Sequence, residues 1–163
     1  MAGKIFGQPV SRLEDKHLLT GRAKFIDDIE IPGMLHAAFL RSDYAHAIIK
    51  SIDVSAAKEH PGVVAVYTAE DFGDYWRVGP LQVPPPSAIK GSQFSARPLP
   101  PIAKGKVRFS GEPIALVIAE SRYIAEDALE DIVFDAEPLP AVIDLEKAWE
   151  DTSVLVHDDL PSN

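Results

Sequence analysis

The sequence predicts an α+β fold of mixed small sheets, in which short helices and tight turns join the strands. Strand, helix and strand follow one another twice, which predicts two short β-α-β units. These units cover 47–54, 55–60 and 63–67, and then 114–119, 121–130 and 132–136. Their helices are too short for a long doubly wound sheet, and a chain of 163 residues fits one domain over 1–163.

Residues 1–34 predict an irregular N-terminal arm. Ser11-Arg12-Leu13-Glu14 has the spacing of a capping box, so a short helical turn is expected to begin there and to end at Gly21. Pro32-Gly33 marks a turn before the first predicted strand, 35–41.

The first β-α-β unit is marked by its residue types. Residues 47–54 mix apolar and polar side chains in the alternation of a half-buried strand. Asp53 or Ser55 can cap the short helix that follows, and Pro61-Gly62 ends that helix. Val63 to Tyr67 is β-branched and apolar, which predicts a strand.

A proline-rich loop is predicted over 80–101, which holds seven of the 14 prolines. Prolines at this density favour extended, polyproline-like backbone without regular hydrogen bonds. A loop of this length inside a compact domain is either functional or disordered. Trp76 lies beside the loop and is a candidate for an interface.

The second unit follows a short predicted strand at 106–109. Residues 114–119 form a nearly continuous apolar run, which predicts a central strand. Ser121 can cap the next helix, from Arg122 to about Glu130. A last short helix over 145–149 places Trp149 at helical spacing from Leu145, so we expect Trp149 in the core.

Composition excludes several classes of partner and site. The net charge of -9 would repel nucleic acid and anionic membrane surfaces, so neither is expected as a partner. Without cysteine the chain cannot form a disulfide, a thiolate zinc site or a Cys-ligated iron–sulfur cluster. No apolar run approaches the length of a membrane span, and the expected location is the cytoplasm.

Catalytic signatures are missing as well. The glycines do not form a dinucleotide fingerprint or a phosphate loop, and there is no G-x-S-x-G elbow. The five histidines are scattered, with no pair at the i, i+4 spacing of a metal site on a helix. We therefore expect no catalytic, metal-binding or cofactor-binding residues in this chain.

Two local clusters each have a functional and a structural interpretation. Ser42 and His46, within Arg41-Ser42-Asp43-Tyr44-Ala45-His46, could act near a carboxylate in a hydrolase, or could belong to a loop whose polar groups bind nearby backbone. Gly111-Glu112-Pro113 could present backbone N–H groups to an anion, or could form a tight β-turn that needs glycine. The structural interpretation is favoured in both cases.

The order of short sequence segments then matters more than any one of them. They run from about residue 5 to Asn163 and include Arg12-Leu13-Glu14-Asp15, Leu18-Leu19-Thr20-Gly21-Arg22-Ala23-Lys24-Phe25-Ile26-Asp27-Asp28, Pro32-Gly33-Met34-Leu35-His36-Ala37-Ala38-Phe39, Lys106-Val107-Arg108-Phe109-Ser110-Gly111-Glu112-Pro113-Ile114-Ala115, Glu137-Pro138-Leu139-Pro140-Ala141-Val142 and His157-Asp158-Asp159-Leu160-Pro161-Ser162-Asn163. In this order they resemble the N-terminal α/β hammerhead domain of the large, molybdenum-binding subunit of the xanthine dehydrogenase/aldehyde oxidase family, in its carbon monoxide dehydrogenase-like branch. Asp43 and Asp135-Ala136 depart from the usual pattern, which has proline and Asp-Tyr there.

The resemblance implies a hammerhead fold within an enzyme that oxidises aldehydes, heteroaromatics or carbon monoxide. Such enzymes use molybdopterin cytosine dinucleotide with iron–sulfur clusters and FAD, and their catalytic residues lie after the hammerhead. This chain is therefore expected to be a non-catalytic domain or small subunit that packs on the cofactor domains and on the iron–sulfur and FAD subunits. The family's loop before the strand matching 106–109 approaches the substrate funnel, which makes Phe94, Arg97 and Leu99 candidate funnel or interface residues.

A second hypothesis comes from the proline-rich loop rather than from the family. The chain could be a stand-alone binding or regulatory module that contacts its ligand through residues 80–101. A gene neighbour encoding a cofactor-binding subunit would favour the first hypothesis over this one.

Overall fold

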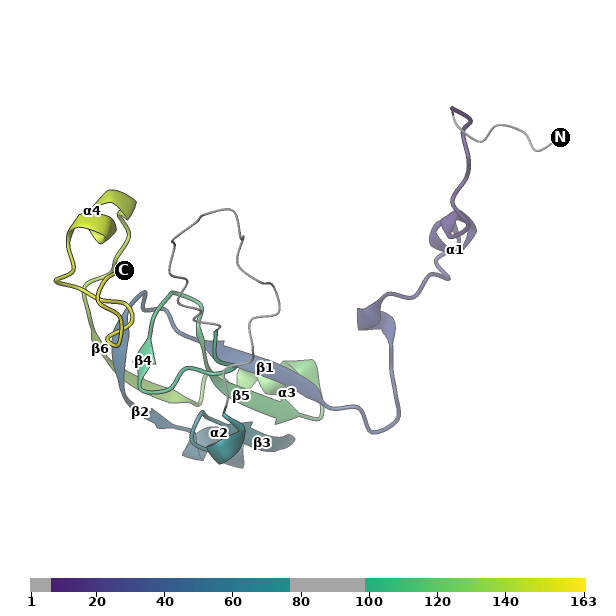
Figure 1. Ribbon diagram of the computed structural model, residues 1–163. Coiled ribbons are helices and arrows are strands. Elements are labelled where there is room, and N and C mark those ends of the chain that lie inside the picture. Colours follow the sequence, from purple (N-terminus) through teal and green to yellow (C-terminus); the bar gives the residue numbers. More distant parts are fainter. Residues whose placement is uncertain (1–6, 77–98) are drawn as a thin grey trace. The chain divides into compact units, whose positions relative to one another are not determined.

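The computed structural model describes residues 7–76 and 99–163 (Figure 1). It divides into two units, one ending at Met34 and the other running from Leu35 to Asn163. Phe94, Arg97 and nearly all of the proline-rich loop therefore lie outside the described residues.

The described part of the arm, residues 7–34, has local structure and no buried residue. Its helix α1 (Asp15–Leu19) begins four residues after Ser11, and the Asp15 carboxylate, not a Ser11 capping box, accepts the N–H of Arg12 at 3.1 Å. The 3-10 helix η1 (Ile26–Asp28) is closed in the same way, because the carboxylate of Asp28 accepts the N–H of Phe25 at 2.9 Å. Both turns depend on a side chain three residues ahead rather than on tertiary packing.

The first sheet of the main unit has the order β1-β5-β3. The central strand β5 (Pro113–Ala119) pairs antiparallel with β1 (His36–Arg41) and with β3 (Val63–Tyr67). Strands pair with both of its edges, which confirms the predicted central position. Its side chains on the face toward α2 and α3 (Ala115, Val117 and Ala119) are fully buried.

The second sheet has the order β4-β2-β6. Strand β2 (Ala47–Asp53) lies between β4 (Lys106–Val107) and β6 (Val133–Pro138), again antiparallel to both. The strand–helix–strand order is confirmed, but the expectation of mixed sheets is wrong, because all strand pairs in the described residues are antiparallel.

The strands of each β-α-β segment are not parallel neighbours, because each segment starts in one sheet and ends in the other. Helix α2 (Ser55–Glu59) leads from β2 into β3, and α3 (Arg122–Asp127) leads from β5 into β6. A parallel crossover within one sheet needs a connection of about a dozen residues or more, usually a full helix. Helices of five and six residues instead turn the chain onto the other sheet.

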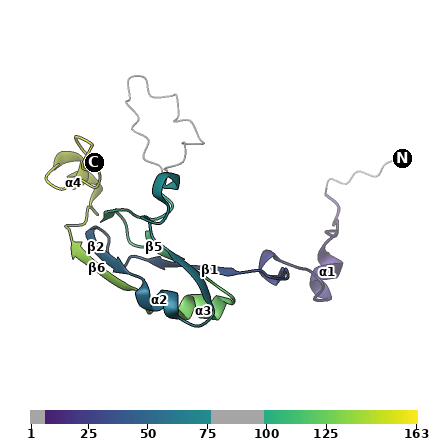
Figure 2. The ribbon, with the colours of Figure 1, turned by 90° about the horizontal axis from the view of Figure 1, so that it is seen from below.

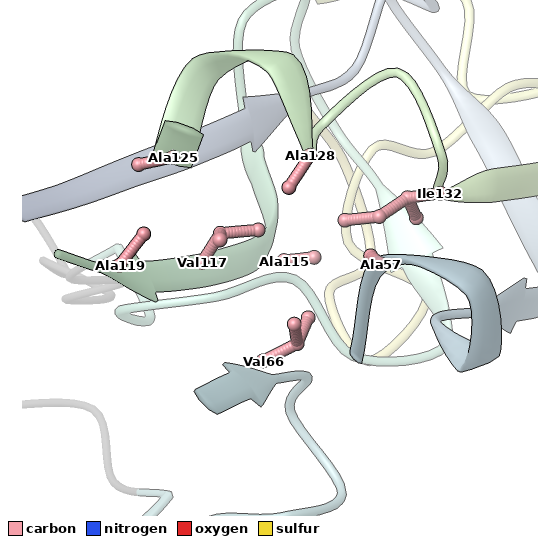
Figure 3. Close-up of a cluster of buried hydrophobic side chains, with 8 residues drawn as sticks. All are labelled: Ala57, Val66, Ala115, Val117, Ala119, Ala125, Ala128 and Ile132. Atoms are coloured by element: carbon pink, nitrogen blue, oxygen red, sulfur yellow. The ribbon is translucent and has the colours of Figure 1, made fainter. Parts of the chain in front are cut away.

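Both helices pack on the same face of the β1-β5-β3 sheet (Figure 2). Small side chains let them approach closely: Ala57 of α2 and Ala125 of α3 are fully buried (Figure 3). The remaining buried members of this cluster are Val66, Ala115, Val117, Ala119, Ala128 and Ile132. A second cluster of Ala47, Ala103, Val107 and Ile114 joins the two sheets, with Phe134 and Ile52 packed against it.

The sequence predicted how a helix begins better than it predicted which side of a helix is buried. Ser121 accepts the N–H of Ile124 at 3.2 Å, as predicted for the cap of α3. Trp149 of α4 (Leu145–Glu150) is exposed, so the expectation that it belongs to the core is wrong. Helical spacing defines a stripe of side chains, but not which stripe faces the body; in α4 the half-buried residue is Ala148.

Candidate functional site

The two chain segments that flank residues 77–98 are joined to each other. The indole Nε1 of Trp76 donates a hydrogen bond to the carbonyl of Ile102 at 2.8 Å. Ile102 is itself buried, and the next residue, Ala103, donates its N–H to the carbonyl of Pro113 at 2.7 Å. The proline-rich loop therefore leaves from and returns to one anchored point at the start of β5.

A cation covers the outer side of this anchor. The ammonium of Lys104 lies 5.9 Å from the centre of the Trp76 ring and 3.0 Å from a carboxylate oxygen of Glu70. Trp76 thus has two structural partners, Ile102 and Lys104, where the loop begins, and its role at an interface stays a prediction. Leu99 lies near the end of the proline-rich loop, among the described residues, and is exposed. Phe94 and Arg97 cannot be placed, so the funnel assignment stays a prediction.

Ser42 and His46 do not form a nucleophile and base. The Ser42 hydroxyl accepts the N–H of Tyr44 at 3.0 Å, and Nδ1 of His46 donates to the carbonyl of Pro140 at 2.9 Å. The other ring nitrogen, Nε2, is buried without a partner. A nucleophile needs a base within hydrogen-bond reach, and neither ring nitrogen binds Ser42. The structural interpretation of this cluster is confirmed.

The Gly111-Glu112-Pro113 segment is also a turn rather than an anion site. Gly111 has φ +90°, which favours glycine, and its N–H donates to the carbonyl of Ser42 at 2.7 Å. The N–H of Glu112 donates to the carbonyl of Phe109 at 3.2 Å. Both N–H groups are therefore occupied within the protein, and the anion-binding interpretation is wrong.

Glu112 is a buried carboxyl that the sequence analysis assigned only to a turn. One of its oxygens, Oε2, accepts the N–H of Arg108 at 2.6 Å, while Oε1 is buried without a partner. Burial raises the pKa of Glu112, and the Arg108 N–H and guanidinium oppose that rise. No spacing rule marks such a residue, because its partner is a backbone group in the same turn.

Lysine and arginine side chains connect this turn to the C-terminal segment. Lys106 Nζ lies 2.7 and 2.6 Å from the two carboxylate oxygens of Asp158, and this hydrogen bond lowers the pKa of Asp158. Arg108 Nη1 donates to the carbonyl of Lys106 at 3.2 Å, and its Nε is buried without a partner. These groups hold residues far apart in sequence together, and within 7–76 and 99–163 no three His, Asp or Glu side chains gather where a metal ion could bind.

Within residues 35–76 and 99–163, helices cover one face of the β1-β5-β3 sheet and leave the other without a helical layer. The face opposite α2 and α3 carries Ala37 and Phe39 of β1, Leu116 and Ile118 of β5, and Ala65 and Tyr67 of β3, which we call the open face. Phe39 and Tyr67 are exposed, and even Leu116 and Ile118 on the central strand are only half-buried. Antiparallel sheets with one wet face normally alternate apolar and polar residues. Here both faces are apolar.

The charged residue at the edge of this face is engaged by the protein. The guanidinium of Arg41 lies 5.8 Å from the centre of the Phe39 ring, and its Nη1 donates to the carbonyl of Gly111 at 2.8 Å. The open face is therefore an apolar surface of aromatic and aliphatic side chains, with properties typical of a protein–protein contact.

Comparison with known proteins agrees with this fold. Residues 20–140 match the model of the aldehyde oxidase and xanthine dehydrogenase a/b hammerhead domain. The chain is 44% identical over 144 residues to the nicotine 6-hydroxylase large subunit of Paenarthrobacter nicotinovorans, covering 88% of this chain and 17% of that protein. It is 40% identical over 149 residues to the carbon monoxide dehydrogenase large chain of Afipia carboxidovorans, covering 91% of this chain and 17% of that protein.

A solved structure shows the same likeness in three dimensions. Quinoline 2-oxidoreductase from Pseudomonas putida 86 superposes with a TM-score of 0.79 at 44% identity, over 94% of this chain and 19% of that one. The chain thus spans less than a fifth of the length of these relatives.

Within the described residues, every helix is too short or too polar to cross a bilayer. By the family match and these identities, the chain belongs to the aldehyde oxidase and xanthine dehydrogenase family of molybdenum hydroxylases, as its α/β hammerhead domain.

Proposed function

We propose that this hammerhead is a non-catalytic part of a molybdenum hydroxylase that packs on the cofactor-binding domains and shapes access of the substrate. The observation that carries the proposal is the open face of the β1-β5-β3 sheet. A domain that functioned alone in water would normally place polar residues at Phe39, Tyr67 and their neighbours. The relatives are about five times longer, so they contain further chain against which such a face can pack.

The role in substrate access is proposed because Trp76 and Ile102 anchor the two ends of the proline-rich loop. The Trp76–Ile102 hydrogen bond fixes both flanks of residues 77–98 at one place on the body. Leu99, exposed just before the buried Ile102, projects an aliphatic side chain there. We propose that Leu99, with Phe94 and Arg97, lines the funnel by which an aldehyde, a heteroaromatic compound or carbon monoxide reaches the metal.

The redox groups are proposed to lie elsewhere in the enzyme. Molybdopterin cytosine dinucleotide carries phosphates that need N–H or cationic donors, and the N–H groups of the Gly111 turn already bind carbonyls. Lys106 is likewise paired with Asp158. These residues do not fit the cofactor, and a chain without cysteine offers no thiolate for an iron–sulfur cluster. The cofactor domains and the iron–sulfur and FAD subunits are the proposed partners, in the cytoplasm.

The test is assembly in the native host. A double variant, Phe39→Ser with Tyr67→Ser, should reduce recovery of the hammerhead with the molybdenum-containing chain at least about tenfold, because two aromatic contacts are lost. Val133→Ser with Tyr123→Ser is the matched control, since both residues are exposed on other surfaces. Circular dichroism should show that both variants are folded.

Two outcomes would contradict the proposal. If the open-face variant assembled as well as the control, that face would not be the packing surface. If the purified 163-residue chain alone bound molybdopterin and oxidised aldehydes, the non-catalytic role would be wrong. Substitution of Leu99 by Ala in the intact enzyme should change KM for bulky substrates more than for small ones, with molybdenum content unchanged.

A further inference from the structure

Three large apolar side chains project from the segment that contains α4. Ile143, Leu145 and Trp149 are 90%, 87% and 88% exposed, and we call them the α4 ridge. Leu145 and Trp149 are four residues apart, so they lie on the same side of the helix. Ile143 immediately precedes the N-cap residue, Asp144, and adds a third exposed apolar side chain beside the helix.

The helix is held by its cap rather than by these side chains. The Asp144 carboxylate accepts the N–H groups of Glu146 and Lys147, both at 3.1 Å. None of its residues is buried, and Ala148 alone among 145–150 is half-buried. A helix of six residues is marginal in water without tertiary packing. The exposed Leu–Trp pair therefore has the form of an anchor that a partner groove would cover.

The charges next to the α4 ridge indicate which kind of partner groove would be complementary to it. Between positions 144 and 151 there are four acidic residues and one basic residue, Lys147. The acidic residues are Asp144, Glu146, Glu150 and Asp151. Glu146 and Glu150 line the same shallow depression as Leu145 and Trp149. Complementarity requires a partner with an apolar floor and a rim of lysine or arginine. A second copy of this chain, with its net charge of -9, would bring like charges together.

We infer that the α4 ridge inserts into a basic-rimmed apolar groove on the cofactor-binding part of the large subunit, as a contact separate from the open face. The inference rests on the proposed function, because that function supplies the partner. It adds the position, the anchor residue and the charge of the second contact. Trp149 is the expected centre of the contact, since buried tryptophans dominate the binding energy of many interfaces.

Photo-crosslinking in the native enzyme tests the position. A benzoylphenylalanine placed at Trp149 should crosslink to a peptide of the molybdenum-cofactor-binding part that contains Lys or Arg, identified by mass spectrometry. The same group placed at Tyr123, an exposed aromatic residue of α3, is the matched control and should give a different crosslink or none. A crosslink from position 149 to a second copy of this chain, or no crosslink, would overturn the inference.

Variants test the energy and the charge. Trp149→Ala should weaken assembly of the hammerhead with the cofactor-binding part by about 30-fold, the scale of an interface hot spot, while Tyr123→Ala leaves it unchanged. Glu146→Gln with Glu150→Gln should slow association and reduce its dependence on salt. An unchanged affinity for Trp149→Ala would overturn the inference.

The two proposals fail in different ways. If the hammerhead does not assemble with any molybdenum-containing chain, the proposed function is wrong, and the α4 contact, which depends on it, is wrong too. If it assembles, and the open-face variant weakens assembly but Trp149→Ala does not, only the α4 contact is wrong. Tryptophan fluorescence adds a second measurement: in a Trp76→Phe background, Trp149 emission should shift to shorter wavelength on assembly.

Discussion

The arm and the hammerhead body are both rich in large apolar residues, yet only the body buries them. Ile114, on the central strand of the body, is 0% exposed, whereas Ile26 in the arm is 87% exposed. In the body, two antiparallel sheets bring residues distant in sequence onto one another. In the described arm, the turns are closed by contacts three to six residues apart, such as those of Asp15 and Asp28.

This difference teaches that apolar content makes a core only where long-range strand pairing gathers it. The arm has Leu13, Leu19 and Phe25 fully or largely in solvent, and its order depends on local hydrogen bonds. Local elements of this length are marginal in water. We therefore expect the body to unfold as the cooperative unit and the arm to contribute little to its stability.

The largest expected effect comes from the same substitution made in both regions. Ile114→Ala should lower the free energy of unfolding by about 2–5 kcal/mol, because it removes buried methyl groups and leaves a cavity between the two sheets. Ile26→Ala should change it by less than about 0.5 kcal/mol, because that side chain is in solvent. Urea unfolding of the two variants measures both, and equal losses would refute the comparison.

A smaller effect is expected from glycines with left-handed backbone. Gly62 has φ +85°, and a Cβ there would lie 2.8 Å from Cδ1 of Ile124 on α3. Gly62→Ala should lower the free energy of unfolding by about 1–3 kcal/mol, as the sum of backbone strain and overpacking. Thermal unfolding would check this value.

Two controls separate those two causes. Gly105→Ala, in the body at φ +70° with nothing within 4 Å, carries only the backbone strain and should lower the free energy of unfolding less than Gly62→Ala does. Adding Ile124→Val to Gly62→Ala removes the clashing Cδ1 atom and should restore part of the loss. A double variant no more stable than Gly62→Ala would show that packing against α3 is not the cause.

Next in size is the pH dependence from Glu112. Because burial raises its pKa above the ordinary value of 4.5, the folded state holds this proton more tightly than the unfolded state. Its stabilising contribution is therefore present below pH 4.5 and is lost as pH rises through the folded-state pKa. Glu112→Gln should remove that loss, so the variant should gain stability relative to wild type as the pH rises above 4.5.

For Asp158 the expected change of stability with pH has the opposite sign, so this residue is the matched control. The hydrogen bond with Lys106 lowers its pKa from 3.8, so its contribution is present above that pH and is lost as pH falls through the folded-state pKa. Asp158→Asn should therefore lose stability relative to wild type at neutral pH and recover under acid conditions. Urea midpoints across the pH range measure both, and parallel profiles for all three proteins would contradict the assignment.

The smallest expected effect is that of removing the arm. A chain beginning at Leu35 should unfold within about 0.5 kcal/mol of the 163-residue chain, because no described arm residue is buried. Hydrogen exchange should show little protection of arm amides in the 163-residue chain and greater protection in the assembled enzyme. A loss above about 1 kcal/mol on truncation would show that the arm belongs to the cooperative unit.

Local features were predictable from sequence where the interaction itself is local. The Ser121 cap of α3, the Gly111 turn and the strand at 114–119 needed only neighbouring residues or a run of apolar ones. The Glu112 burial and the Lys106–Asp158 pair were not predictable, because the residues that enclose or bind them come from other elements. Trp149 was misplaced because spacing cannot show which side of a helix meets the body.

The sequence by itself determined the family, the α+β class and the absence of thiolate chemistry, since each depends on residue order or residue type. Only the tertiary structure decided that both strand–helix–strand units pass from one sheet to the other and that all described strand pairs are antiparallel. It also decided which apolar residues stay uncovered, on the open face and along α4. The physical reason is that burial is a property of which strands pair, and strand pairing joins residues that no local pattern connects.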